Sequence, residues 1–125
     1  MKLRNLYLLN SIVSLGFALG FFLMSTFLLG LLGMEVTSDT RTLGQLIAVE
    51  LVVGGVTTFL ARDVTDAKAT GAINTGNILA GLIGTVVALV ATLSGVMGWF
   101  GWVVTVVYLL IAIAFGYFQF IKPSR

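Results

Sequence analysis

The sequence contains no cysteine and no histidine, and only 10% of its residues are charged. Without these two residue types the chain has no disulfides, no thiolate iron–sulfur site and none of the common zinc or haem ligands. It also lacks the usual general base near neutral pH and every nucleophile scheme built on cysteine or histidine. We therefore expect no catalytic residue, no metal and no cofactor, and we expect the protein not to be an enzyme.

The scarcity of charge also excludes an ordinary soluble domain, in which roughly a quarter of the residues are charged. Hydrophobic residues make up 58% of the 125 positions, and the mean hydropathy is +1.09. A disordered segment is excluded as well, because it would need low hydrophobicity and high net charge. A core of this size cannot hide so much apolar surface, so the excess is expected to face lipid.

Four long apolar stretches follow one another along the chain. A membrane-spanning helix needs about 20 mostly apolar residues to cross a hydrocarbon core of roughly 30 Å. Stretches of this kind lie at about residues 6–32, 43–61, 72–93 and 99–121. The first is longer than the roughly 7–15 apolar residues of a signal peptide, so we expect a permanent helix there. Because short links make neighbouring helices antiparallel, the prediction is one all-α domain over residues 1–125, an antiparallel up-down four-helix transmembrane bundle.

The positions of the basic residues predict the orientation of this bundle. Six of the seven fall on the side that holds both termini, and only Arg41 falls on the other side. These six are Lys2, Arg4, Arg62, Lys68, Lys122 and Arg125. The positive-inside rule then predicts a multi-pass protein of the plasma (inner) membrane with cytoplasmic N- and C-termini. The basic residues do not form a stripe, so we expect no nucleic acid as a partner.

Aromatic residues near the ends of the stretches agree with a bilayer. Trp99 and Trp102 begin the fourth stretch at the outer side, whereas Tyr7 and Tyr117 lie near the inner side. Such side chains prefer headgroup depth, where the ring is buried and the N–H or O–H stays wet. We expect these four residues to be interface anchors.

Small residues recur inside the apolar stretches and indicate where helices pack. Lipid tails are as apolar as leucine, so close backbone approach and interhelical hydrogen bonds hold such helices together. The candidate packing residues are Gly16, Gly20, Gly54, Gly81, Gly84 and Ala88. They indicate either packing within the four helices or, for the stripe on the third stretch, a face toward a partner protein or a second copy.

Glu50 is the most informative residue, because it lies deep in an apolar stretch. It follows Thr42 by eight residues, which places it roughly 12 Å below the outer end of its helix. A charged side chain at such depth costs about 2.5–3.5 kcal/mol on insertion scales. Polar residues predicted at the same depth form an intramembrane cluster of Glu50, Tyr108, Thr85, Ser25 and Thr57. This cluster is either a satisfied structural network or a proton-linked or cation-binding site.

Two asparagines form a second polar feature, near the inner end of the third stretch. Asn74 and Asn77 are three residues apart and therefore share one face of a helix. We expect them to form hydrogen bonds with neighbouring helices.

Two segments resemble known small membrane proteins. The segment IAVELVVGGVTTFL (residues 47–60) resembles the second helix of DoxX-like proteins, and SGVMGWFGWVVTVVYLLIAIAFGYF (residues 94–118) resembles the last helices of other uncharacterised small four-helix membrane proteins. The resemblance implies a four-helix membrane fold, sometimes associated with a larger redox or membrane complex. Small multidrug resistance transporters also have four short helices and one membrane-embedded glutamate, but theirs lies in the first helix, whereas Glu50 lies in the second.

Two hypotheses for function follow. In the first, the chain is a small non-enzymatic accessory or assembly subunit of a larger membrane complex. Its small size, short links, small-residue stripes and lack of reactive side chains favour this hypothesis. In the second, it is a homodimeric proton-coupled transporter of small molecules that uses Glu50.

Overall fold

The computed structural model describes residues 1–122, which form helices and connecting loops with no strand among them. The elements are α1 (Leu3–Leu23), α2 (Ser25–Leu31), α3 (Ser38–Ala61), α4 (Ala67–Leu93), α5 (Phe100–Gly116) and a short π-helix, η1 (Tyr117–Ile121). Four helices are long and apolar enough to cross a membrane: α1, α3, α4, and α5 continued by η1. The expected all-helical class with four candidate spans is confirmed.

Two of these helices begin about five residues earlier than the hydropathy pattern predicts, because polar caps start them. At α3, the Thr40 backbone N–H donates to the Thr37 side chain over 3.1 Å, and the Thr37 N–H donates to the Thr40 hydroxyl over 2.8 Å. At α4, the Ala69 N–H donates to the Asp66 carboxylate over 2.7 Å. Such caps satisfy backbone donors that a helix start leaves free. The starts expected at residues 43 and 72 are therefore wrong.

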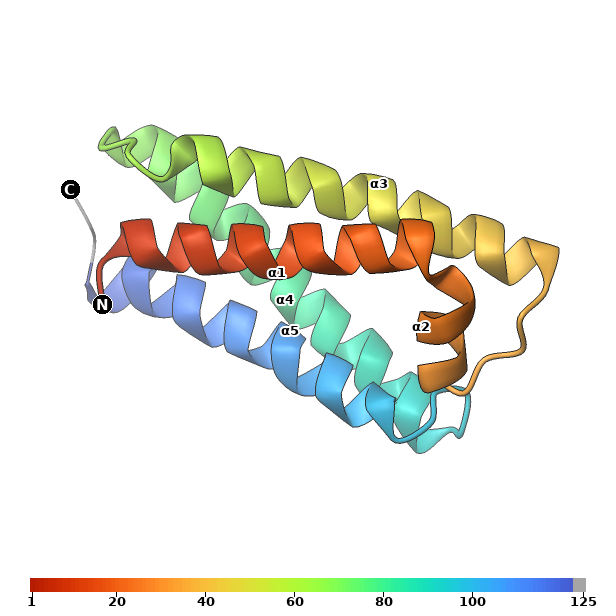
Figure 1. Ribbon diagram of the computed structural model, residues 1–125. Helices are drawn as coiled ribbons and strands as arrows, with labels where there is room; N and C mark the ends of the chain where they lie inside the picture. The colour runs from red at the N-terminus through yellow and green to blue at the C-terminus, as the bar shows by residue number, and fades with distance from the viewer. Residues whose placement is uncertain (123–125) are drawn as a thin grey trace.

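The first apolar stretch is not one helix, as expected for residues 6–32, but two. Helix α1 ends where Met24 leaves helical geometry, with φ −125° and ψ 37°. Helix α2 then turns across the end of the molecule (Figure 1), and the Leu28 side chain packs against Gly20. Gly33 follows with φ +70°, and the Gly98 N–H donates to the Leu32 carbonyl over 2.8 Å. The break lets α2 reach the link between α4 and α5.

The helices associate as two pairs, α1 with α3 and α4 with α5. Contacts in each pair run in reverse order along the two helices, so the second helix returns beside the first (Figure 1). In the first pair the contacts are Asn10–Thr58, Leu15–Gly55 and Phe21–Gly44. In the second pair they are Gly81–Ala112, Gly84–Tyr108 and Thr92–Gly101. Glycine lies at five of these six contacts, as expected where helix backbones approach closely.

The main core lies where the two pairs meet, at the end of the molecule where α1 begins and η1 ends, which we call the terminal end (Figure 1). The Tyr7 and Phe115 rings stack there with centroids 5.9 Å apart, and their exposed fractions are 1% and 0%. The core consists of Leu3, Leu6, Tyr7, Ala61, Phe115 and Phe118. It joins α1 and the end of α3 to α5 and η1.

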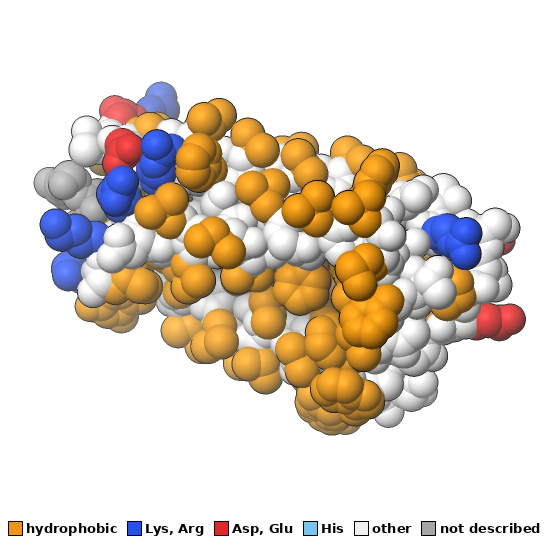
Figure 2. All heavy atoms as spheres, in the orientation of Figure 1, with side chains coloured by type: hydrophobic (Ala, Val, Ile, Leu, Met, Phe, Trp, Pro, Cys, Tyr) orange, Lys and Arg blue, Asp and Glu red, His pale blue; other side chains and the backbone are white. Residues whose placement is uncertain are grey.

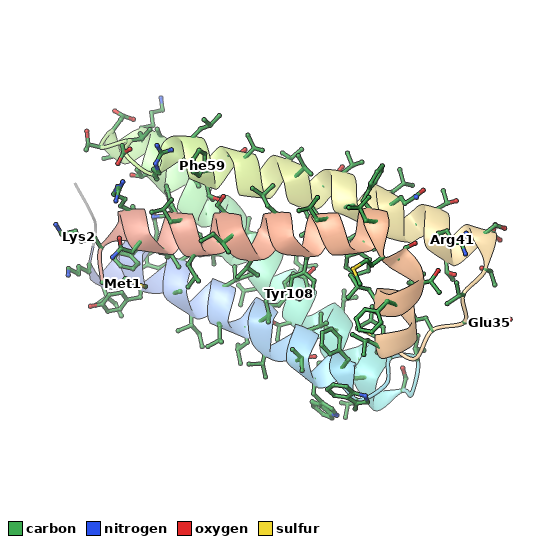
Figure 3. The ribbon with its side chains drawn as sticks, in the orientation of Figure 1. Met1, Lys2, Glu35, Arg41, Phe59 and Tyr108 are labelled. Atoms are coloured by element: carbon green, nitrogen blue, oxygen red, sulfur yellow. The ribbon has the colours of Figure 1, made fainter. Side chains whose placement is uncertain are left out.

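Hydrophobic side chains cover the outside of the molecule between two polar ends. Figure 2 shows apolar side chains over the middle and charged side chains at both ends. Lys2 lies at the terminal end, whereas Glu35 and Arg41 lie at the opposite end (Figure 3). Large residues on every long helix are exposed, such as Leu19, Val53, Val86 and Leu110. This pattern is typical of a chain whose sides contact lipid.

Replacement of Gly81 by alanine is expected to separate α4 from α5. A Cβ atom at this position would lie 2.7 Å from the Ala112 backbone nitrogen, so the helices would have to shift. We expect Gly81→Ala to lower the free energy of unfolding by about 1–3 kcal/mol. The measurement is unfolding in mixed detergent micelles, followed by circular dichroism.

The matched control is Gly76→Ala in the same helix, where a Cβ would meet nothing within 4 Å. This variant should be neutral, or more stable by up to about 1 kcal/mol, because alanine favours helix more than glycine does. Equal losses in the two variants would contradict the close contact at Gly81.

Candidate functional site

Glu50 lies on the outer face of α3, in the middle of a candidate span. Its side chain is exposed, and within residues 1–122 no hydrogen bond or ion pair to its carboxylate occurs. The buried face of α3 carries Gly44, Ala48, Gly55 and Thr58. Because each residue turns the helix by about 100°, Glu50 lies about 200° from Ala48 and points away from α1. The carboxylate therefore faces the surroundings of the molecule.

The predicted polar cluster around Glu50 does not form, and that expectation is wrong. The Thr85 hydroxyl donates to the Gly81 carbonyl of its own helix over 2.6 Å. Tyr108 packs against Gly84 in the other helix pair, and Ser25 is buried in α2. Of the expected members, only Thr57 shares the outer face of α3 with Glu50, and it is also exposed. Depth alone did not reveal which way each side chain points.

A different polar network is buried between the two helix pairs. The Tyr7 hydroxyl lies 2.9 Å from Asn74 Oδ1 and 3.4 Å from the Thr70 carbonyl. The Asn74 amide donates to Gln119 Oε1 over 3.3 Å. This network, which we call the Tyr7 network, joins α1 to α4 and η1. A second bond, from the Asn10 amide to the Thr58 hydroxyl over 3.4 Å, joins α1 to α3.

Two expectations for these polar residues need correction. Tyr7 is buried in the core and is not an interface anchor. Asn77 does not reach a neighbouring helix, because its amide donates to the Ile73 carbonyl over 2.9 Å. The spacing of Tyr7, Asn10, Ser11 and Ser14 places polar groups on one face of α1, and this spacing is the signal that could have revealed the buried network.

The predicted packing glycines divide into two groups. Gly81 and Gly84 pack against α5, and Gly20 packs against Leu28 of α2. Ala88 is also buried, with 3% of its surface exposed. The expectation is wrong for Gly16 and Gly54, since a Cβ at either position would meet nothing within 4 Å.

In the pair of α1 and α3, Gly55 packs against Leu15 and Ser14, and Gly44 packs against Phe21. The small residues of α4 are buried inside the molecule. They therefore do not form a face toward a partner protein or a second copy. The open glycine beside Glu50 is Gly54.

The remaining predicted anchors are exposed. Trp99 and Trp102 have exposed fractions of 68% and 49% near the start of α5, and Tyr117 has 44% at the start of η1. Their positions fit contact with a membrane surface, which stays a prediction.

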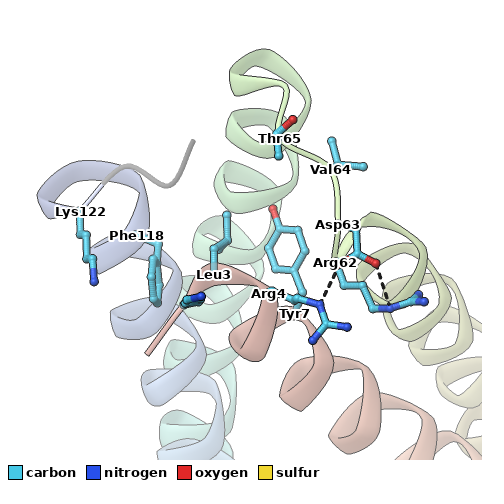
Figure 4. A pocket seen from close by; sticks show the side chains of 10 residues that line it. Leu3, Arg4, Tyr7, Arg62, Asp63, Val64, Thr65, Phe118 and Lys122 are labelled. Carbon is cyan, nitrogen blue, oxygen red and sulfur yellow. Dashed lines mark hydrogen bonds and ion pairs between the residues drawn. The ribbon is translucent and has the colours of Figure 1, made fainter.

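A basic pocket of about 280 Å³ opens at the terminal end of the molecule (Figure 4). Its charged lining is Lys2, Arg4, Arg62, Lys122 and Asp63. The Arg4 guanidinium contacts the Asp63 carboxylate over 2.8 Å, and Arg62 contacts it over 3.5 Å. Arg125, which was counted with the basic residues of this end, lies outside the described residues.

The described residues include no group of three or more histidine, cysteine, aspartate or glutamate side chains that could hold a metal ion. The side chains of the Tyr7 network can donate or accept hydrogen bonds, and those of the basic pocket can attract an anion. Searches of protein-family models, curated proteins and solved structures found no match for the chain.

Loss of the Tyr7 hydroxyl is expected to weaken the contact between the helix pairs. Tyr7→Phe keeps the stacked ring but leaves Asn74 Oδ1 without the donor it has at 2.9 Å. Because interhelical hydrogen bonds in membrane proteins contribute about 0.6–1.7 kcal/mol, the free energy of unfolding in micelles should fall by a similar amount.

Tyr117→Phe is the matched control, since the Tyr117 side chain is exposed. Its effect should stay within about 0.5 kcal/mol. If Tyr7→Phe is no more destabilising than this control, the Tyr7 network does not hold the pairs together.

Proposed function

We propose that this chain is a small non-enzymatic membrane protein that serves as an accessory or assembly subunit of a larger membrane complex. The observation that carries the proposal is the exposed Glu50 carboxylate in the middle of α3. Large apolar side chains surround it on the same face, namely Leu46, Ile47 and Val53, with exposed fractions of 58%, 48% and 58%. A partner helix could bind a carboxyl group that is exposed among apolar side chains in this way.

The cost of leaving Glu50 in lipid explains why a partner is needed. A charged side chain at the bilayer centre costs about 2.5–3.5 kcal/mol on insertion scales. A helix that offers a hydrogen-bond donor or a basic side chain at the same depth would remove this cost. Gly54, one turn further along α3, has open space beside it, so such a helix can approach the backbone closely. We call the outer face around Glu50, Gly54 and Thr57 the Glu50 face.

We further propose that the helices form an antiparallel transmembrane bundle with both termini in the cytoplasm, in the plasma (inner) membrane. The pocket-lining cations and Lys68, in the first turn of α4, support this orientation. Arg41 is at the other end (Figure 3). The positive-inside rule counts lysine and arginine, so the acidic Asp63 and Asp66 do not weaken it.

Epitope tags test this orientation. Tags at either terminus should be cleaved by protease in inside-out vesicles and protected in right-side-out vesicles. A tag inserted after Val36, between α2 and α3, should show the reverse pattern. Termini that are accessible from different sides would contradict an even number of membrane crossings.

Substitution of the Glu50 face is expected to release the chain from its complex. On native gels of mild-detergent extracts, the wild-type protein should migrate in a heavier assembly. Because a hydrogen bond to a charged group contributes about 1.5–3 kcal/mol, Glu50→Ala should reduce the assembled fraction about tenfold or more. Gly54→Leu should have a similar effect by preventing close approach.

Two controls match these changes. Glu35→Ala removes an exposed carboxylate outside the helices, and Gly16→Leu fills an open glycine on α1. Both should leave the assembly intact. Migration of the wild-type protein as a free monomer would defeat the proposal.

A homodimeric proton-coupled transporter is the second candidate, and the exposed Glu50 face favours it too. If two copies pack through this face, the Glu50 carboxyls of both copies lie together at the contact between them. The native gel would then show a dimer and nothing heavier, and Glu50→Gln would abolish proton-coupled uptake in vesicles. We rank this candidate second because, among residues 1–122, no second acidic side chain and no basic side chain accompanies Glu50 in the middle of the helices.

A further inference from the structure

Among the described residues, the basic pocket carries more positive than negative charge. Four cationic side chains line it, against the single acidic side chain of Asp63. Asp63 is shared by Arg4 and Arg62. Neither Lys2 nor Lys122 forms an ion pair with another residue in the range 1–122. An anion in the pocket would therefore find two ammonium groups with which no described acidic side chain is paired.

The arginines of the pocket are held in place. The Arg62 guanidinium lies 4.2 Å from the centre of the Phe59 ring and donates to the Phe59 carbonyl over 2.7 Å. The Arg4 Nε atom contacts the Asp63 carboxylate over 2.8 Å, which orients the guanidinium. Since a planar guanidinium binds phosphate oxygens well, these side chains present donors without further ordering.

The rest of the lining is apolar. Leu3, Tyr7 and Phe118 form the inner wall, and all three belong to the core. In Figure 4 basic side chains lie on both sides of Leu3 and Phe118, with Lys122 on one side and Arg4 on the other. The volume of about 280 Å³ suits a group of headgroup size with some apolar surface.

We propose that this pocket binds the phosphate headgroup of an anionic phospholipid from the leaflet at the terminal end. The pocket lies at the end of the four candidate spans, which is headgroup depth for helices that cross a bilayer. Basic pockets between transmembrane helices at this level attract anionic headgroups. A free phosphate compound shares the charge but does not use the apolar wall, and this difference favours the lipid.

Native mass spectrometry of the full, untagged chain released from detergent micelles tests the proposal. The chain is titrated with phosphatidylglycerol, with phosphatidylcholine and with the soluble compounds glycerol 3-phosphate and inorganic phosphate. Phosphatidylglycerol should bind at least tenfold more tightly than the other three. Because each basic group near an anionic surface strengthens binding about fivefold, the double variant Lys2→Gln/Lys122→Gln should weaken it about 25-fold.

Lys68→Gln is the matched control, because Lys68 is basic and exposed near the same end but does not line the pocket. It should change the affinity less than twofold, with circular dichroism showing equal helix content in all variants. Equal affinity for phosphatidylcholine, or an equal loss in the control, would overturn the proposal. Soluble phosphates that bind as tightly as the lipid would overturn the assignment to a headgroup.

Discussion

The fold depends on how two tight helix pairs are held to each other. Within each pair, glycines allow the backbones to approach, but between the pairs there are few close backbone contacts. The Tyr7 side chain provides the main connection: its ring stacks on Phe115, and its hydroxyl binds Asn74. If the four candidate spans cross a bilayer, apolar burial does not drive them together, and this buried aromatic and polar contact then has a larger role than it would have in a soluble protein.

The molecule therefore has two ends of different character. At the terminal end, the Tyr7 network and the aromatic core are tightly packed, and the basic pocket lies against them. At the other end, α2 closes the structure through the backbone bond between Gly98 and Leu32. Between the ends, the helices present apolar side chains outward, and Glu50 is the one acidic residue of this middle region in the described residues. The proposed protein contact and the proposed lipid contact thus use separate surfaces.

Several features of the sequence were sufficient to predict structure. Long apolar stretches predicted the four candidate spans, because a helix forms its backbone hydrogen bonds within its own segment and needs no water to do so. Thr37 and Asp66 are residue types that commonly cap helices. The expected starts were taken from hydropathy alone, and they were therefore too late. The break at Met24 was not predicted, because no proline marks it. It brings Leu28 of α2 against Gly20 of α1, a contact that the sequence pattern does not reveal.

The amino-acid sequence by itself determined the helical class, the number of apolar helices and the depth of Glu50 along α3. The tertiary structure decided which face of each helix is covered, because that depends on which small residues meet a neighbour. Gly55 and not Gly54 meets α1, and this choice turns Glu50 outward. Likewise, Tyr7 is buried because α1 packs against both α4 and α5 at this level. The depth of a residue along its helix follows from local spacing. The direction in which its side chain points follows from contacts between segments far apart in the chain.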